Sequence, residues 1–83
     1  MGLSEVFVGD LSYFCTETDL IERLEAFGAI QNAVIKRDSN GNSLLYGFVH
    51  FTSTVSAKRA IQLMNNQMFM GRNIMYVALS QLH

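Results

Sequence analysis

The segment from Leu44 to Phe51 alternates between two faces and is the clearest strand pattern in the chain. Side chains of a strand point alternately to its two sides, so Tyr46, Phe48 and His50 share one face. The opposite face carries Leu45, Gly47, Val49 and Phe51. The second row is typical of a buried core. The first row would leave two aromatic rings exposed, and large exposed apolar groups usually mark a binding surface.

Two segments have the periodicity of amphipathic helices. The first is predicted to begin after Thr16, whose side chain can cap the helix with Asp19 in reach three positions later, and to end at Gly28. Its apolar positions are Leu20, Leu24 and Phe27. The second has apolar residues at i, i+3, i+4 and i+7, namely Ala57, Ala60, Ile61 and Met64. The small alanines predict a close approach to the sheet, opposite Gly47.

Three further strands complete the expected fold, at residues 6–11, 30–36 and 73–79. Asn40-Gly41 predicts a hairpin between the second and third strands. We expect Val34 and Lys36 to point outward from the second strand, and Met75, Val77 and Leu79 from the last, with Ala33, Ile35, Ile74 and Tyr76 inward. The order strand-helix-strand-strand-helix-strand predicts an α+β, ferredoxin-like split βαβ fold. In this fold both helices cover one face of a four-stranded antiparallel sheet.

Length and composition indicate a single small domain. Its 83 residues, 49% of them hydrophobic, are enough for one domain with one core. There is no long apolar run and no secretory leader, so we expect an intracellular protein of the nucleus, the cytoplasm or both. The single Cys15 excludes an internal disulfide and a cysteine-rich metal site. No motif implies a cofactor or a metal.

Charge limits how the chain can bind. Six basic and seven acidic residues give a formal net charge of -1, whereas proteins that bind nucleic acid usually carry a basic surface. Affinity for a nucleic acid would therefore come from stacking and base-edge hydrogen bonds, with few phosphate contacts. An enzyme is not expected, because Cys15 with His50, or His50 with His83, lacks a third group to orient a base.

Two segments together resemble the RNA recognition motif family. The family has an aliphatic-aromatic-aliphatic-x-x-Leu hexapeptide, matched at residues 6–11, and an octapeptide whose last six positions match Tyr46 through Phe51. Leu44 and Leu45 depart from its usual basic residue and Gly. The resemblance covers almost the whole chain and implies one such domain at residues 1–83, as a module of a larger protein. It implies that Phe7, Tyr46 and Phe48 stack bases of single-stranded RNA.

Other residues are candidates for the same surface. Lys36 and Arg37 end the second strand beside the expected rings and are candidate phosphate or base-edge donors. His50 lies in line with the rings, and Leu44 and Met75 occupy outward positions. In the family, residues after the last strand often contact bases, which makes Gln81 a candidate. The predicted RNA-binding set is Phe7, Lys36, Arg37, Leu44, Tyr46, Phe48, His50, Met75 and Gln81.

Within the family, the chain is similar to the first RNA recognition motif of poly(A)-binding proteins and to the motifs of T-cell intracellular antigen proteins. That similarity implies a preference for A-rich or U-rich RNA and a role in mRNA processing, stability or translation. Both groups place a Trp near the end of the last strand, and this chain has none. The alternative is a protein-interaction domain of the same fold, which would use the neutral sheet face or the helix face carrying Glu22 and Glu25. We expect a monomer in isolation, without membrane contact.

Overall fold

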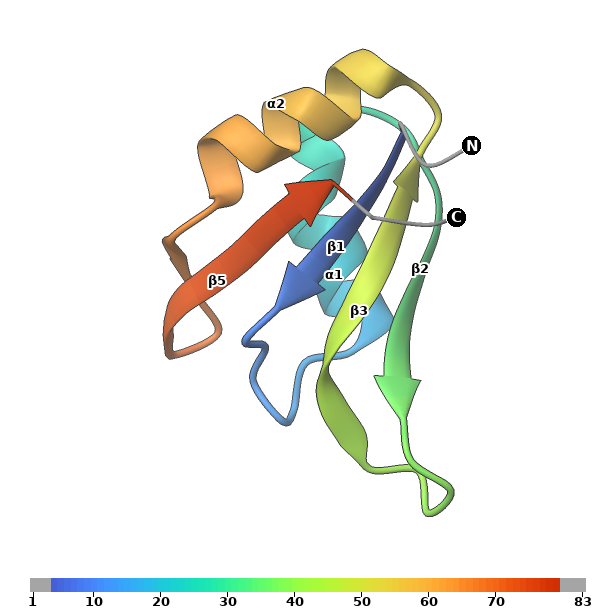
Figure 1. Ribbon diagram of the computed structural model, residues 1–83, viewed down its shortest axis with the longest axis vertical. Coiled ribbons are helices and arrows are strands. Elements are labelled where there is room, and N and C mark those ends of the chain that lie inside the picture. The colour runs from blue at the N-terminus through green and yellow to red at the C-terminus, as the bar shows by residue number, and fades with distance from the viewer. Residues whose placement is uncertain (1–3, 80–83) are drawn as a thin grey trace.

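Two helices cover one face of an antiparallel sheet, and among the described residues no helix covers the other, which we call the open face (Figure 1). This architecture comes from a computed structural model that describes residues 4–79, without the side chains of 72–76 and 79. The elements are β1 (Glu5–Gly9), α1 (Glu17–Leu24), the 3₁₀ turn η2 (Glu25–Phe27), β2 (Ile30–Arg37), β3 (Ser43–Phe51), α2 (Thr54–Met64), β4 (Gln67–Phe69) and β5 (Arg72–Leu79). The strand order is β2-β3-β1-β5-β4. The predicted fold is confirmed, and the short β4 is added at one edge.

The core lies between the sheet and the helices, and it follows from alternation in the strands. Val6 and Val8 of β1 and Val49 of β3 are fully buried. Against them the helices pack the apolar positions that the periodicity predicted, with Leu20, Leu24, Ala57, Ala60 and Met64 all fully buried. Burying one such aliphatic side chain contributes about 1.5–3 kcal/mol. The core therefore fixes which strand positions are left to face outward.

Both ends of α1 are set by local interactions. The Thr16 side chain accepts a hydrogen bond from the Asp19 backbone N–H (3.2 Å), and the Asp19 carboxylate accepts one from the Thr16 N–H (2.9 Å). This is the predicted capping box. After α1 the chain tightens into η2 and reaches Gly28, where φ is 147° and a Cβ atom would collide with the Ser56 side chain of α2. The α-helix itself ends at Leu24, and the helical segment as a whole ends at Gly28, where the sequence predicted the stop.

The atoms nearest to a Cβ at Gly47 belong to β2 rather than to α2, the predicted neighbour. A Cβ atom at this position would collide with the backbone carbonyl oxygen of Val34 and lie 3.0 Å from the Cα of Ile35, both on β2. A side chain at residue 47 would therefore push apart β2 and β3. Glycine lets these strands pair closely between Tyr46 and Phe48, the two ring-bearing positions.

One predicted side-chain direction in the last strand is wrong. Val77 was expected outward, but it is 1% exposed and pairs with the buried Val8. Residues 74–79 are nearly all apolar, so alternation could not tell the two faces of this strand apart. The predicted directions of Ile74, Met75, Tyr76 and Leu79 fall on side chains outside the described part of the structure.

The start of β3 also departs from simple alternation. Leu45 has a φ of 69°, and the β2–β3 register shifts between Ile35 and Arg37. The strand begins at Ser43, which is buried, and Leu44 follows it on the exposed side. A left-handed residue inside a strand marks a bulge, which periodicity alone does not reveal.

Replacing Gly47 with Ala is expected to lower the free energy of unfolding by about 1–3 kcal/mol, the usual cost of forcing an extra methyl group into a packed region. Urea denaturation followed by circular dichroism measures the change. Gly41→Asn is the matched control, because residue 41 is exposed, has nothing within 4 Å of a Cβ, and has a φ of 85° that Asn tolerates. That variant should stay within about 0.5 kcal/mol of the original. An equal loss in both variants would contradict the proposed collision with β2.

Candidate nucleic-acid interface

Three aromatic rings contact one another at the centre of the open face. The Phe7 ring lies 5.7 Å from the Tyr46 ring at an interplanar angle of 30°, and 5.8 Å from the Phe48 ring at 70°. Tyr46 and Phe48 are 6.2 Å apart, edge to face. All three side chains are half-buried, so part of each ring is exposed. The sequence predicted that these three rings share one face of the sheet, and the structure confirms it.

The strand register arranges the open face in rows across the sheet. In the aromatic row, Val34 of β2 pairs with Phe48, Phe48 with Phe7, and Phe7 with Ala78 of β5. Val34 is 45% exposed and extends the apolar surface beyond the rings. Flat apolar rings at this spacing offer stacking surfaces to planar groups such as nucleobases.

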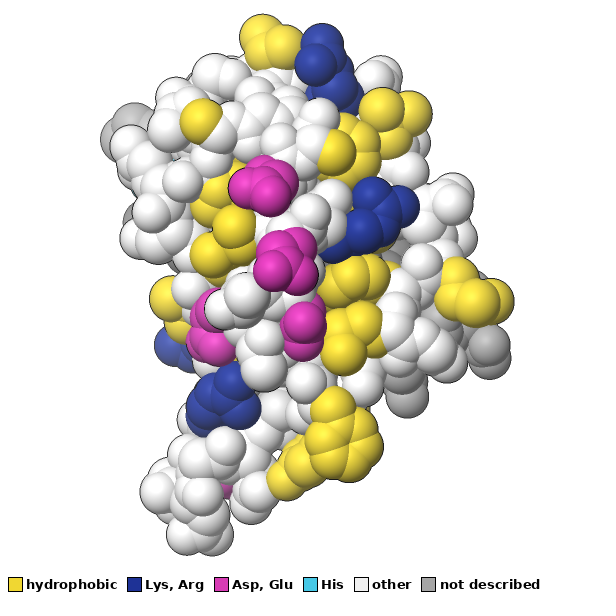
Figure 2. Space-filling model, turned by 180° about the vertical axis from the view of Figure 1, so that it is seen from behind, with side chains coloured by type: hydrophobic (Ala, Val, Ile, Leu, Met, Phe, Trp, Pro, Cys, Tyr) yellow, Lys and Arg dark blue, Asp and Glu magenta, His cyan; other side chains and the backbone are white. Residues whose placement is uncertain are grey.

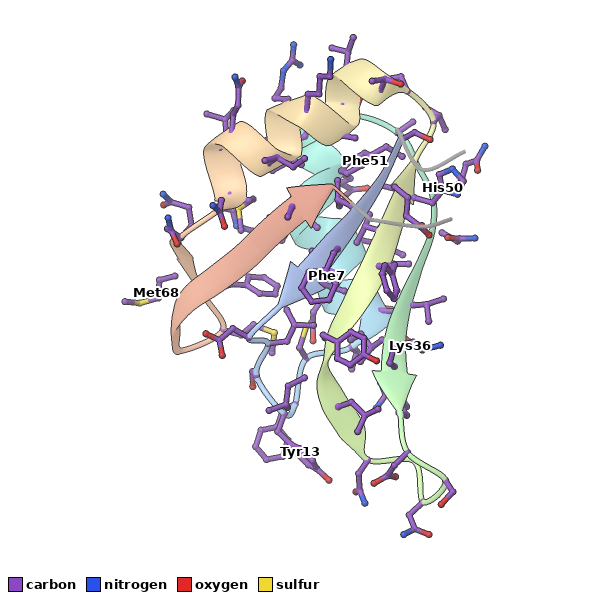
Figure 3. All side chains as sticks on the ribbon, viewed as in Figure 1. Phe7, Tyr13, Lys36, His50, Phe51 and Met68 are labelled. Carbon is purple, nitrogen blue, oxygen red and sulfur yellow. The ribbon has the colours of Figure 1, made fainter. Side chains whose placement is uncertain are left out.

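Lys36 is exposed, and its strand places it two residues along β2 from Val34, on the outward side (Figure 3). In the same view it lies near one end of the ring cluster, whereas His50 lies at the other. The His50 ring Nε2 is 3.1 Å from the Ser4 hydroxyl. Leu44 is 46% exposed. Lys36 and His50 thus flank the rings as predicted, and Leu44 is exposed as predicted.

Arg37 does not join this surface. Its guanidinium pairs with the Glu17 carboxylate of α1 at 3.4 Å and lies 3.5 Å from the Gly41 carbonyl oxygen. Arg37 directly follows the outward Lys36, so strand alternation turns it toward the helix layer. Arg37 therefore does not lie beside the rings as expected, and its role as a phosphate or base-edge donor stays a prediction. Gln81 lies outside the described residues, as does the Met75 side chain.

Sequence reasoning missed an exposed aromatic pair beside this face. Tyr13 and Phe14 lie in the loop after β1, with ring centroids 5.3 Å apart, and Phe14 is 78% exposed. The Tyr13 hydroxyl donates to the Asn42 side chain in the β2–β3 loop at 2.5 Å. Two adjacent aromatic residues ahead of a helix cap were the available signal. Their hydrogen bond ties together two loops at one end of the sheet.

The helix side of the molecule has a different character. Seen from behind, acidic side chains gather along the middle of the surface (Figure 2). The helical segment of α1 and η2 carries four acidic residues, Glu17, Asp19, Glu22 and Glu25, and one basic residue, Arg23. Beside this helix, burial raises the pKa of the Cys15 thiol to about 11, with Asp19 and Glu17 adding to the effect. The thiol is therefore protonated at neutral pH and a poor nucleophile.

A family comparison decides the assignment. The sequence model described as RNA recognition motif matches residues 6–75. The chain belongs to the RNA recognition motif family. The match includes both ring-bearing strands, β1 and β3.

Relatives within this family come from several organisms. The chain is 35% identical over 69 residues to polyadenylate-binding protein 4 of Arabidopsis thaliana, covering 83% of this chain and 10% of that protein. It is 39% identical over 72 residues to spliceosome-associated protein 49 of Schizosaccharomyces pombe, covering 86% of this chain and 22% of that protein. The chain thus spans less than a quarter of these relatives' length.

Solved structures agree with this RNA recognition motif assignment. One titled RNA binding protein PG1 superposes with a TM-score of 0.90 at 32% identity, covering 96% of both chains. A Sex-lethal protein/RNA complex superposes with a TM-score of 0.90 at 28% identity, covering 96% of this chain and 48% of the other. Among the described residues, neither helix has the length and apolar character needed to span a membrane.

The ion pair that holds Arg37 also protects an edge of the motif's sheet. Glu17 Oε2 accepts a hydrogen bond from the Ile35 backbone N–H at 2.9 Å, on the outer strand β2. This bond, followed by smaller contributions that include Arg37, lowers the pKa of Glu17 despite partial desolvation. An ionised Glu17 therefore stabilises the fold, and this stabilisation is complete above the ordinary pKa of 4.5. It is lost as the pH falls through the lowered pKa of the folded state.

Glu17→Gln is expected to lower the free energy of unfolding by about 1 kcal/mol at pH 7, because it replaces a charge-assisted hydrogen bond with a neutral one. The difference between the two proteins should shrink as the pH falls below the carboxyl pKa, where the original Glu17 is also neutral. Urea denaturation at pH 7 and at about pH 3 measures both values. Glu22→Gln, on the exposed part of α1, is the control. A pH-independent difference would contradict the role of the charge.

Proposed function

We propose that this domain binds single-stranded RNA on its open sheet face, by stacking bases on Phe7, Tyr46 and Phe48. One observation carries the proposal: three mutually contacting, partly exposed rings occupy the uncovered face of an RNA recognition motif. Relatives named as polyadenylate-binding and spliceosome-associated proteins support it, as does the superposition on a protein/RNA complex. No step in this function requires catalysis.

The expected stacking energy predicts weak RNA binding by a single domain. Stacking is worth about 1–3 kcal/mol per base, so two or three bases give an affinity of roughly micromolar order once ordering costs are subtracted. We therefore propose that the domain acts beside other domains, in line with its small share of its relatives' length. Its place would be mRNA processing, stability or translation, in the nucleus or the cytoplasm.

Removing any one ring should weaken RNA binding by about 1–3 kcal/mol, which is roughly 5- to 150-fold in Kd. The variants are Phe7→Ala, Tyr46→Ala and Phe48→Ala, each checked for folding by circular dichroism. Fluorescence anisotropy with labelled seven-nucleotide RNAs of mixed sequence gives the Kd values. Val55→Ala is the control, because Val55 is 65% exposed on α2, on the covered side of the sheet. Unchanged affinity in all three folded ring variants would overturn the proposal.

Lys36 should supply a phosphate contact, so Lys36→Ala is expected to reduce the slope of log K against log salt by about 0.7, the value for one contact to a single strand. The loss should be similar for all RNA sequences, because a phosphate contact carries no base information. Lys58→Ala on α2 is the matched control and should leave the slope unchanged. An unchanged slope in Lys36→Ala would show that Lys36 makes no phosphate contact.

A further inference from the structure

A polar row crosses the open face next to the aromatic row. Glu5 of β1 pairs with His50 of β3, and His50 pairs with Asn32 of β2. The next pairs along the same strands are Val6 with Val49, which face the core, and then Phe7 with Phe48. Glu5 and His50 therefore share the outward face with the rings, one pleat away. Cα atoms two residues apart in a strand are about 7 Å apart, which a glutamate side chain can span.

Glu5 has an unused hydrogen-bonding capacity at this position. Its side chain is half-buried, and one carboxylate oxygen, Oε1, is shielded from water and accepts no hydrogen bond within the structure as described. Shielded acceptors in folded proteins nearly always have a donor, and leaving one without a donor costs about 1–3 kcal/mol. A ligand N–H reaches this oxygen only when the Glu5 side chain turns outward, and pairing with the ligand then removes this cost.

The other two residues of the row, His50 and Asn32, can complete a recognition site. Asn32 is exposed, and its amide offers both a donor and an acceptor. The His50 Nε2 already has the Ser4 hydroxyl at 3.1 Å, which holds the ring in place. The row thus combines a carboxylate that only accepts with side chains that can donate.

Base chemistry identifies the ligand that fits this row. Guanine carries two neighbouring donors on its Watson–Crick edge, N1–H and N2–H, beside the O6 acceptor. The two oxygens of one carboxylate can accept from both donors, as they do from an arginine fork. On the Watson–Crick edges of adenine, cytosine and uracil, each donor has a ring-nitrogen or carbonyl acceptor beside it. One carboxylate oxygen would then face an acceptor of the base, which is unfavourable.

We propose that Glu5 selects guanine for the base stacked on Phe7 and Phe48, with Asn32 donating to O6. This inference rests on the proposed RNA binding and adds a base preference to it. It replaces, at this one position, the A-rich or U-rich preference that the family resemblance implied. The negative charge of Glu5 would repel phosphates, so the RNA backbone would pass the other end of the face, where Lys36 lies.

The test compares seven-nucleotide RNAs that carry G, A, C or U at the centre of a uridine background. Fluorescence anisotropy measures Kd for the original protein and for Glu5→Gln. The guanine RNA should bind about tenfold more tightly than the others, and Glu5→Gln should remove most of that difference. Replacing guanosine with inosine, which lacks the N2 amino group, should also remove most of it. Guanosine replaced by 7-deazaguanosine is the control and should bind as guanosine does, because only the Hoogsteen edge is changed.

A second variant keeps the test valid if Glu5→Gln alters the fold. Glu5→Asp retains the charge on a shorter side chain, and it should also lose the preference while binding the other three RNAs within about twofold. Amide NMR spectra verify that each variant is folded. Binding that depends on the rings but shows no guanine preference would overturn this inference alone. A preference that survives in both variants would also overturn it, whereas no RNA binding at all would overturn the proposed function as well.

Discussion

The antiparallel pairing of β1 with β3 is the constraint on which the rest of the structure depends. Its register sets Val6 against Val49 on the covered face and Phe7 against Phe48 on the open face. Because side chains alternate, burying the first pair under the helices requires the second pair to face outward. A slip of one residue would bury the rings and expose the valines. The hydrophobic core and the candidate binding surface are therefore two results of one register.

Further contacts hold β2 on the other side of β3. Gly47 allows β2 to pair closely with β3, and Glu17 satisfies an N–H on the outer side of β2 while it holds Arg37 away from the open face. That ion pair leaves Lys36 as the cation beside the rings on this strand. With a net charge of -1, the chain is better suited to recognition by stacking and base edges than by bulk attraction to phosphates. The polar row at Glu5 agrees with this picture.

Periodicity predicted the fold well wherever one face of an element was polar or small. Thr16 with Asp19 marked the start of α1, and the alternation around Phe48 marked the central strand, because each reflects local geometry. Val77 was misplaced because β5 is apolar on both faces, so only pairing with Val8 decides its direction. Arg37 was misplaced because its partner, Glu17, lies twenty residues earlier in the chain. The bulge at Leu45 and the polar row likewise depend on pairing between strands, which the sequence does not display directly.

The most direct test of the account is to record intermolecular NOEs between a bound seven-nucleotide RNA and the aromatic protons of Phe7, Tyr46 and Phe48. Contacts from base and ribose protons to these rings are expected, together with chemical-shift changes along β1 and β3. Contacts confined to the acidic surface of α1, or to the Tyr13–Phe14 loop, with no change at the three rings, would contradict it.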